Sequence, residues 1–234
     1  MEIIRIMLDN GADINNPGAR HSPLGQAAFD FNAEMVQFLL DNGADVNLVD
    51  RGFGSPLVSA VQGSSASDVR LHDKFSPYIK RSTVCVQMLI DNGADVNLAD
   101  GEHETALTEA ALRGNSRVAQ MLLRNGALTN LVSGEYGSAL AAAAVSGHKE
   151  TVDLLLKHGA DINLVAGKYG TALAAAAFHN EAEVVDFLLD NGADINRSGG
   201  EYGTPLAAAA FGGAMYTMKK LLRRGARCHE RKTD

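Results

Sequence analysis

Residues 131–163 read LVSGEYGSALAAAAVSGHKETVDLLLKHGADIN, and this stretch decides the fold because close copies of it recur along the chain. In each copy a Gly-Ala step ends a short apolar run; the glycines are Gly11, Gly43, Gly93, Gly126, Gly159, Gly192 and Gly225. The last five follow one another every 33 residues, after gaps of 32 and 50 residues. A fixed period in this range is typical of stacked supersecondary units rather than of one globular core.

Each unit predicts two short helices. Ser138 can cap the first, in which Leu140, Ala143 and Ala144 have helical spacing and small side chains that allow close helix approach. Residues 151–158 form the second, and Gly159 suits the left-handed backbone past its end. The capping hydroxyl recurs as Ser22, Ser55, Thr105, Thr171 and Thr204, and in three copies Pro23, Pro56 and Pro205 follow it.

About ten residues rich in Asn, Gly, Ser and Tyr separate the units, which predicts a turn or short hairpin. Helices of about 8–10 residues are too short to be stable alone, since isolated helices need ~12–15 residues. Ordering a unit costs on the order of 30–60 kcal/mol of backbone entropy. Burial against both neighbours must offset this cost, so the stack is the folding unit.

These residues resemble the ankyrin repeat. From Ser22 to Asn196 the chain follows its pattern: Thr-Pro-Leu, an Ala pair, a Gly-His turn, a Val/Leu-Leu helix and Gly-Ala-Asp-Val-Asn. One departure recurs, because the usual His after Thr-Pro-Leu is Ala141, Ala174 and Ala207. The Gly-Glu/Lys-Tyr-Gly hairpins look like those in ankyrin arrays of fungal multidomain NACHT-type proteins, although no GxxxxGK[ST] phosphate-binding loop is present.

The resemblance implies an all-α ankyrin-repeat solenoid of stacked helix-turn-helix units joined by short hairpin loops, as a single domain over residues 1–234. The expected units are a partial first repeat at 1–15, repeats at 16–47, 48–97, 98–130, 131–163, 164–196 and 197–229, and a tail at 230–234.

The two ends differ. The first unit lacks its hairpin and first helix, so we expect either a fragment of a longer array or something that covers this face. In the last unit Lys220 and Arg227 replace an apolar and an acidic residue, as a terminal capping repeat requires. We therefore expect the array to end with the chain.

The 48–97 repeat carries an insertion at about 64–80, between its two helices. Ser76 with Pro77 favours a helix start, which predicts a lengthened second helix over residues 78–90. The insertion either folds back on the stack, clasps a partner, or is a tolerated surface loop without a role.

In proteins that this chain resembles, partners bind the concave side formed by hairpin tips and first helices. Carried over by repeat position, the candidate partner-binding residues are Phe29, Asp30, Phe53, Glu102, His103, Leu112, Arg113, Glu135, Tyr136, Lys168, Tyr169, Phe178, His179, Glu201, Tyr202 and Phe211. Aromatic and Arg side chains are common interface anchors. Alternatively, the three tyrosines only pack hairpin against hairpin. Phe29, Phe178 and Phe211 are the sharper candidates, and replacing Phe178 and Phe211 is expected to change thermal stability little.

Composition limits the function further. No stretch approaches the ~20 apolar residues of a membrane span, and the N-terminus does not read as a secretory signal. Cys85 and Cys228 lie far apart, which indicates no disulfide framework and fits a cytoplasmic or nuclear location. Residues 1–218 carry a charge of −12, against +5 for residues 219–234. The acidic body argues against a nucleic-acid ligand. We expect a monomer unless the uncovered N-terminal face pairs.

Enzymatic chemistry is not expected. The seven histidines show no metal-ligand spacing, and there is no GxSxG motif, so we predict no catalytic residue, no metal and no cofactor. The best remaining cluster is Arg70, His72, Asp73, Lys74 and Tyr78 in the insertion.

The predicted function is a non-catalytic module that binds a protein partner in its groove. The alternatives are a small-molecule or catalytic groove gated by residues 64–80, and a sensor fragment of a larger multidomain receptor.

Overall fold

The computed structural model describes residues 2–16, 21–52, 54–63, 77–99 and 104–227, with only the backbone at 77–80. The chain forms two compact units, Met1–Ala106 with Gln120–Ala127, and Leu107–Ala119 with Leu128–Asp234. Each unit is described by itself. The described residues of both units are helices joined by turns and hairpin loops, which confirms the all-α class. None of these helices has the length and apolar character that crossing a bilayer requires.

The first unit contains α1 (Glu2–Asp9), α2 (Pro23–Phe29), α3 (Ala33–Asp41), α4 (Pro56–Gln62) and α5 (Pro77–Asp91). Helix α2 packs against α3 of its own pair and against α4 of the next, and α5 packs against α3 and α4. With 15 residues, α5 is the lengthened second helix that the Ser-Pro step predicts. Residues 64–76 of the insertion lie outside the described residues, and residues 77–80 form the first turn of α5.

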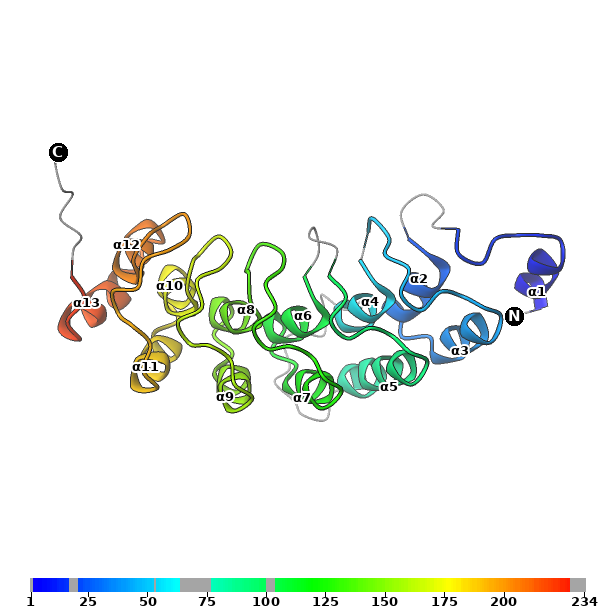
Figure 1. Cartoon of the computed structure of the whole chain (residues 1–234), viewed down its shortest axis with the longest axis horizontal. Helices are drawn as coiled ribbons and strands as arrows, with labels where there is room; N and C mark the ends of the chain where they lie inside the picture. The colour runs from blue at the N-terminus through cyan, green and yellow to red at the C-terminus, as the bar shows by residue number, and fades with distance from the viewer. Residues whose placement is uncertain (1, 17–20, 53, 64–76, 100–103, 228–234) are drawn as a thin grey trace. The chain divides into compact units, whose positions relative to one another are not determined.

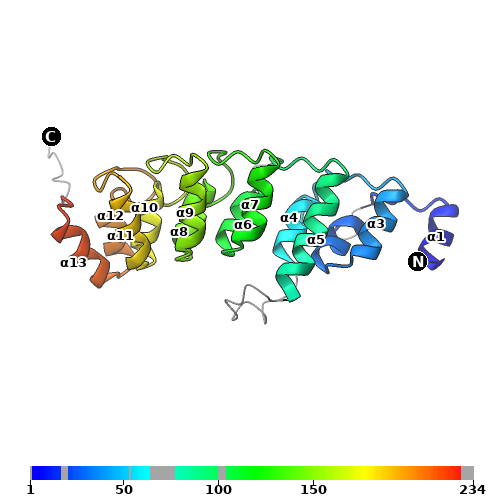
Figure 2. The same ribbon diagram turned by 90° about the horizontal axis from the view of Figure 1, so that it is seen from below.

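The helices α6 (Ala106–Leu112) and α7 (Ser116–Arg124) lie where the two units divide. The second unit continues with α8 (Ala139–Val145), α9 (Lys149–Lys157), α10 (Ala172–Phe178), α11 (Ala182–Asp190), α12 (Pro205–Phe211) and α13 (Met215–Arg223). The first helices α8, α10 and α12 pack in one row and the second helices α9, α11 and α13 in another (Figures 1 and 2). Within the second unit the repeats from α8 to α13 therefore stack layer upon layer in chain order.

Caps and glycines act as the sequence predicts. The Ser138 hydroxyl accepts the Ala141 N–H at the start of α8, and Thr171 and Thr204 act likewise for α10 and α12. The glycine of every Gly-Ala step has a φ between +83° and +94°. A Cβ added to any of these glycines would meet nothing within 4 Å. Backbone handedness alone, and not crowding, therefore requires glycine there.

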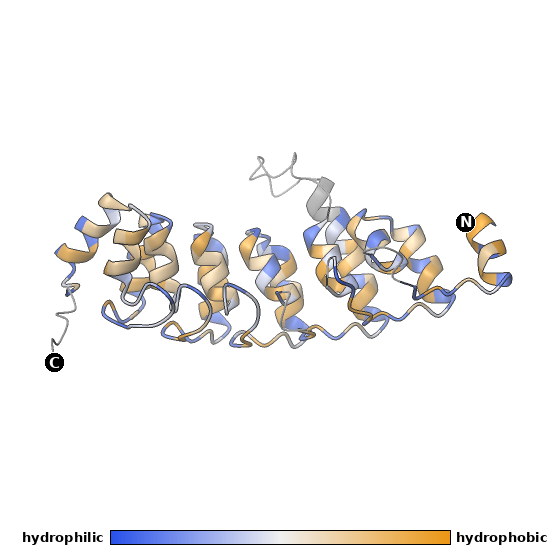
Figure 3. Cartoon of the chain, turned by 90° about the horizontal axis from the view of Figure 1, so that it is seen from above, coloured by the Kyte–Doolittle hydropathy of each residue, from blue (hydrophilic) through white to orange (hydrophobic). Residues whose placement is uncertain are grey.

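Alanine allows the first helices to pack closely. The residues 142–144 of α8 and 174–177 of α10 are fully buried, and Figure 3 shows these helices in the orange of apolar residues. Ala141 and Ala174, at the position where the family pattern has His, are among the buried residues. Small side chains in this row keep neighbouring backbones close together.

Asparagines that stand four residues after the glycine of a Gly-Ala step join neighbouring layers, a role that the sequence pattern does not reveal. Asn163 Oδ1 accepts the Asp194 N–H at 2.8 Å, and Asn130 Oδ1 accepts the Asp161 N–H at 2.8 Å. Asn130 Nδ2 also donates to the Gly159 carbonyl at 3.1 Å. In the first unit Asn15 and Asn47 accept N–H groups of the next layer in the same way. We call this set of bonds the asparagine ladder.

We predict that Asn130→Ala lowers the free energy of unfolding by about 1–2 kcal/mol, because it removes two interlayer hydrogen bonds from a partly solvated site. Asn130→Asp keeps the acceptor for the Asp161 N–H but loses the donor to the Gly159 carbonyl. Its free energy of unfolding should therefore lie between those of the parent chain and Asn130→Ala. Urea unfolding followed by circular dichroism measures both variants. Equal stability of Asn130→Ala and the parent chain would contradict the structural role of the ladder.

Candidate functional site

Three hairpin tips and the ends of two first helices gather most of the predicted binding residues in the second unit. The hairpins close through isolated bridges at Ser133–Gly137, Ala166–Gly170 and Gly199–Gly203. They carry Glu135 and Tyr136, Lys168 and Tyr169, and Glu201 and Tyr202; Phe178, His179 and Phe211 stand at the ends of α10 and α12. The predicted residues Phe53, Glu102 and His103 lie outside the described residues.

Successive hairpins touch backbone to backbone. The Lys168 N–H donates to the Glu135 carbonyl at 2.9 Å, and the Glu201 N–H donates to the Lys168 carbonyl at 2.8 Å. A Cβ added to Gly137 would lie 2.3 Å from the Gly167 nitrogen, and one on Gly170 would lie 2.4 Å from the Gly199 carbonyl carbon. No side chain fits at these contacts, so glycine sets the spacing of the tips.

Aromatic rings line the side of these hairpins. Phe178 contacts Tyr169 of its own layer at 5.4 Å between ring centroids and Tyr202 of the next layer at 4.7 Å. Tyr202 in turn lies 5.5 Å from Phe211. Tyr169 is only 6% exposed, whereas Phe211 is 70% exposed. Tyr169 therefore presents little surface to a partner, and Phe211 presents most of its ring.

Phe178 and Phe211 occupy the same repeat position, but their packing differs. Phe178 contacts three neighbouring rings, including His179 at 5.1 Å, so its replacement would remove packing as well as surface. Phe211 contacts Tyr202 and is otherwise open. A partner-binding role stays a prediction for both, and Phe211 is the residue whose change can test it without disturbing the cluster.

Charged groups alternate along the tips. The Lys168 ammonium lies 3.1 Å from Glu135 Oε1 on the preceding hairpin. This hydrogen bond to Glu135 is the main cause that raises the pKa of Lys168. The tips of the three hairpins border a shallow hollow of about 600 Å³, lined by Gly134, Glu135, Gly167, Lys168, Gly200 and Glu201. Such an open, charged surface suits a macromolecular partner better than an enclosed small ligand.

His179 contacts this cluster from the end of α10. Its Nε2 lies 3.0 Å from the Tyr169 hydroxyl, and the two rings are 5.3 Å apart. Burial lowers the pKa of His179, and the charge of Lys168 lowers it further. Burial also raises the pKa of Tyr169. Both groups are therefore held neutral at neutral pH.

The remaining predicted residues lie elsewhere. Phe29 and Asp30 end α2 in the first unit, where Asp30 Oδ2 accepts a hydrogen bond from Gln26 at 3.0 Å. Arg113 pairs with the buried carboxylate of Glu109 one turn earlier in α6. Leu112 and Arg113 do not belong to the row of rings formed by Tyr169, Phe178, Tyr202 and Phe211.

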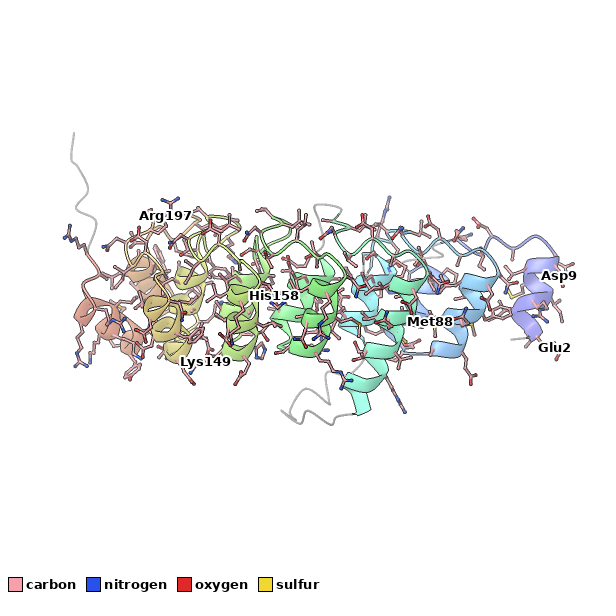
Figure 4. The ribbon with its side chains drawn as sticks, turned by 60° about the horizontal axis from the view of Figure 1, so that its bottom comes forward. Glu2, Asp9, Met88, Lys149, His158 and Arg197 are labelled. Atoms are coloured by element: carbon pink, nitrogen blue, oxygen red, sulfur yellow. The ribbon has the colours of Figure 1, made fainter. Side chains whose placement is uncertain are left out.

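The first unit has a second exposed surface, at α1. Ile3 and Met7 are 74% and 55% exposed, whereas Val184 and Leu188, at the equivalent places of α11, are 1% and 0% exposed. An apolar hollow of about 410 Å³ lies between α1, α2 and α3, and its lining includes Ile4, Leu8, Ala27 and Leu39. Figure 4 labels Glu2 and Asp9 at the two ends of this uncovered helix. Among the described residues no first helix of the same layer covers these side chains.

No catalytic or metal chemistry is visible among the described residues. In these ranges no three His, Cys, Asp or Glu side chains converge as metal ligands would. Burial raises the pKa of the Cys85 thiol to about 11, so the nucleophilic thiolate is scarce at neutral pH. The cluster of Arg70, His72, Asp73 and Lys74 lies outside the described residues, as does the side chain of Tyr78.

Comparison with known families agrees with this architecture. A family model for ankyrin repeats in three copies matches residues 78–166 and 130–199, and a single-repeat model matches residues 20–51. The first model alone covers more than half of the chain, so the chain belongs to the ankyrin-repeat family. Repeats of this family are in general non-catalytic protein–protein interaction modules. The comparison with curated proteins gave no match. The likeness to fungal NACHT-type arrays stays a prediction.

We predict that the stability of the aromatic cluster falls as the pH decreases below about 6.5. The pKa of His179 is lower in the folded chain than its ordinary value of 6.5, so the unfolded chain binds more protons as the pH falls through that value. The contribution of neutral His179 is complete above pH 6.5 and is lost below it.

Thermal unfolding at pH 7.5 and 5.5 tests this with His179→Gln as the control, because all other ionisable groups are the same in both proteins. The melting temperature of the parent chain should fall more between these pH values than that of the variant. A fall of equal size in both proteins would show that His179 has no such role.

Proposed function

We propose that this chain is a non-catalytic module that binds a protein partner on the surface formed by the hairpin tips at 133–137, 166–170 and 199–203 and by the ends of α10 and α12. The observation that carries the proposal is Phe211, whose ring is 70% exposed and continues the row of Tyr169, Phe178 and Tyr202. Exposed aromatic side chains beside charged groups are characteristic of binding hot spots.

The rigidity of this surface supports the same proposal. The hairpins are fixed to one another by main-chain hydrogen bonds, and the rings above them contact across layers. A partner therefore finds the aromatic groups already ordered, which lowers the entropic cost of association. A groove gated by residues 64–80 stays an alternative proposal, because residues 64–76 lie outside the described residues.

Affinity capture from the native cell, followed by mass spectrometry, tests the proposal. We expect Phe211→Ala to reduce partner retention at least tenfold, which corresponds to about 1.4 kcal/mol of binding free energy. The melting temperature should change little, because Phe211 contacts Tyr202 and is otherwise open.

Val84→Ala serves as the matched control, because Val84 is 51% exposed and belongs to α5 of the first unit. This variant should retain the partner as the parent chain does. Equal retention by Phe211→Ala and the parent chain would rule out the proposed surface.

A further inference from the structure

The hairpin at Gly199–Gly203 is the last described hairpin in a series whose tips are joined by main-chain hydrogen bonds. Each later tip donates one N–H to the tip before it, from Lys168 to Glu135 and from Glu201 to Lys168, at 2.9 and 2.8 Å. The next acceptor in the series is the Glu201 carbonyl. Within the described ranges no backbone N–H donates to it. The pattern therefore has an open acceptor at its last tip.

The glycines show the same open end. A Cβ on Gly137 or Gly170 would lie within 2.4 Å of the backbone of the following hairpin. A Cβ on Gly203, which has the same position and a φ of +76°, would meet nothing nearer than Ser198 Oγ at 3.9 Å. The face against which another hairpin packs in the earlier layers is thus unoccupied by described residues at Gly203.

The aromatic row is also incomplete at this end. Phe178 lies between a tyrosine of its own layer and Tyr202 of the following layer, with centroids 5.4 and 4.7 Å away. Phe211 has the tyrosine of its own layer, Tyr202, and is otherwise exposed to solvent. Another aromatic ring one layer further on would contact Phe211 as Tyr202 contacts Phe178.

The exposed carboxylate of Glu201 favours a basic residue directly before that aromatic ring. Lys168 reaches back 3.1 Å to the carboxylate of Glu135 on the preceding hairpin. Glu201 is exposed at the last tip, and its carboxylate has no ion pair in the described part of the chain. A cation one layer further on would reach back to Glu201 in the same way. Figure 4 labels Arg197, which stands two residues before the hairpin at Gly199–Gly203.

We infer that the last tip binds a turn of a partner protein in which a basic and an aromatic residue stand between glycines, the chemistry of Gly167-Lys168-Tyr169-Gly170. The inference rests on the proposed function and names the partner's recognition element. The main-chain acceptor of Glu201, the carboxylate of Glu201, the open face of Gly203 and the ring of Phe211 each match one part of such a turn. A second copy of this chain does not supply it, because its own Tyr169 is buried between layers.

The probe is a fluorescein-labelled cyclic peptide with the sequence of residues 165–172, Val-Ala-Gly-Lys-Tyr-Gly-Thr-Ala, titrated with the full chain and followed by fluorescence anisotropy. We expect saturable binding that Glu201→Lys and Phe211→Ala each weaken at least tenfold. A peptide carrying Lys168→Glu should bind the Glu201→Lys variant better than it binds the parent chain. Unchanged affinity in Glu201→Lys, or no reversal with the exchanged charges, would overturn the inference.

Two matched controls separate docking from general effects. Glu150→Lys makes the same charge change at another exposed position, on α9, and should leave peptide binding unchanged. Gly203→Ala places a methyl group on the docking face and should abolish binding. Gly225→Ala introduces the same strain, because Gly225 also has a left-handed backbone at φ +94° and an added Cβ would meet nothing within 4 Å. This variant should still bind the peptide. Equal effects of the two glycine variants would contradict docking at Gly203.

A variant ending at Arg227 tests whether this chain's own tail, which contains Arg231 and Lys232, is the occupant. Peptide binding that appears only in this variant would assign the site to the tail and overturn the inference. The captured natural partner distinguishes the two proposals. If Glu201→Lys and Gly203→Ala still capture the natural partner and Phe211→Ala does not, the proposed function stands and this inference is refuted.

Discussion

The close approach of successive hairpins is the contact on which the rest of the second unit depends. Glycines at both partners of each contact bring the backbones within hydrogen-bonding distance, as in the bond from Lys168 to Glu135. This spacing matches that of the alanine row below, where α8, α10 and α12 pack against one another and most of their buried residues are alanines. A bulkier residue in either row would separate both, because the layers are rigidly connected.

The same spacing creates the candidate binding surface. Because the hairpin tips are spaced by one layer, residues at the same repeat position lie next to one another in successive layers. The ring centroids of Tyr169 and Tyr202 are 5.8 Å apart, and the Lys168 ammonium pairs with the Glu135 carboxylate. Among the described residues of the second unit, each hairpin tip contacts the tip of the next layer, except the tip at Gly199–Gly203. The groups there are ordinary repeat residues, and their availability to a partner arises from position rather than from unusual chemistry.

Much of the fold follows from local sequence signals. Capping hydroxyls, left-handed glycines and the 33-residue period determine helices such as α8 and α10 because their effects act within a few residues. The asparagine ladder was visible as a recurring Asn, but its bonds join residues about 30 positions apart, and periodicity alone does not reveal them. The sequence could likewise place Phe178 and Phe211 in one column. It could not show that only Phe211 lacks a ring on its outer side, since that depends on three-dimensional neighbours.

The asparagine ladder has a mechanical consequence. Asn163 and Asn196 each accept one backbone N–H of the next layer, so these bonds bear load along the second unit together with the hairpin bonds and the helix packing. Among the described layers, that of α12 and α13 packs against described helices on one side alone, so under tension it would detach before the layer of α10 and α11. Extension would then proceed by peeling one layer at a time, with steps of similar length because the repeats have equal numbers of residues.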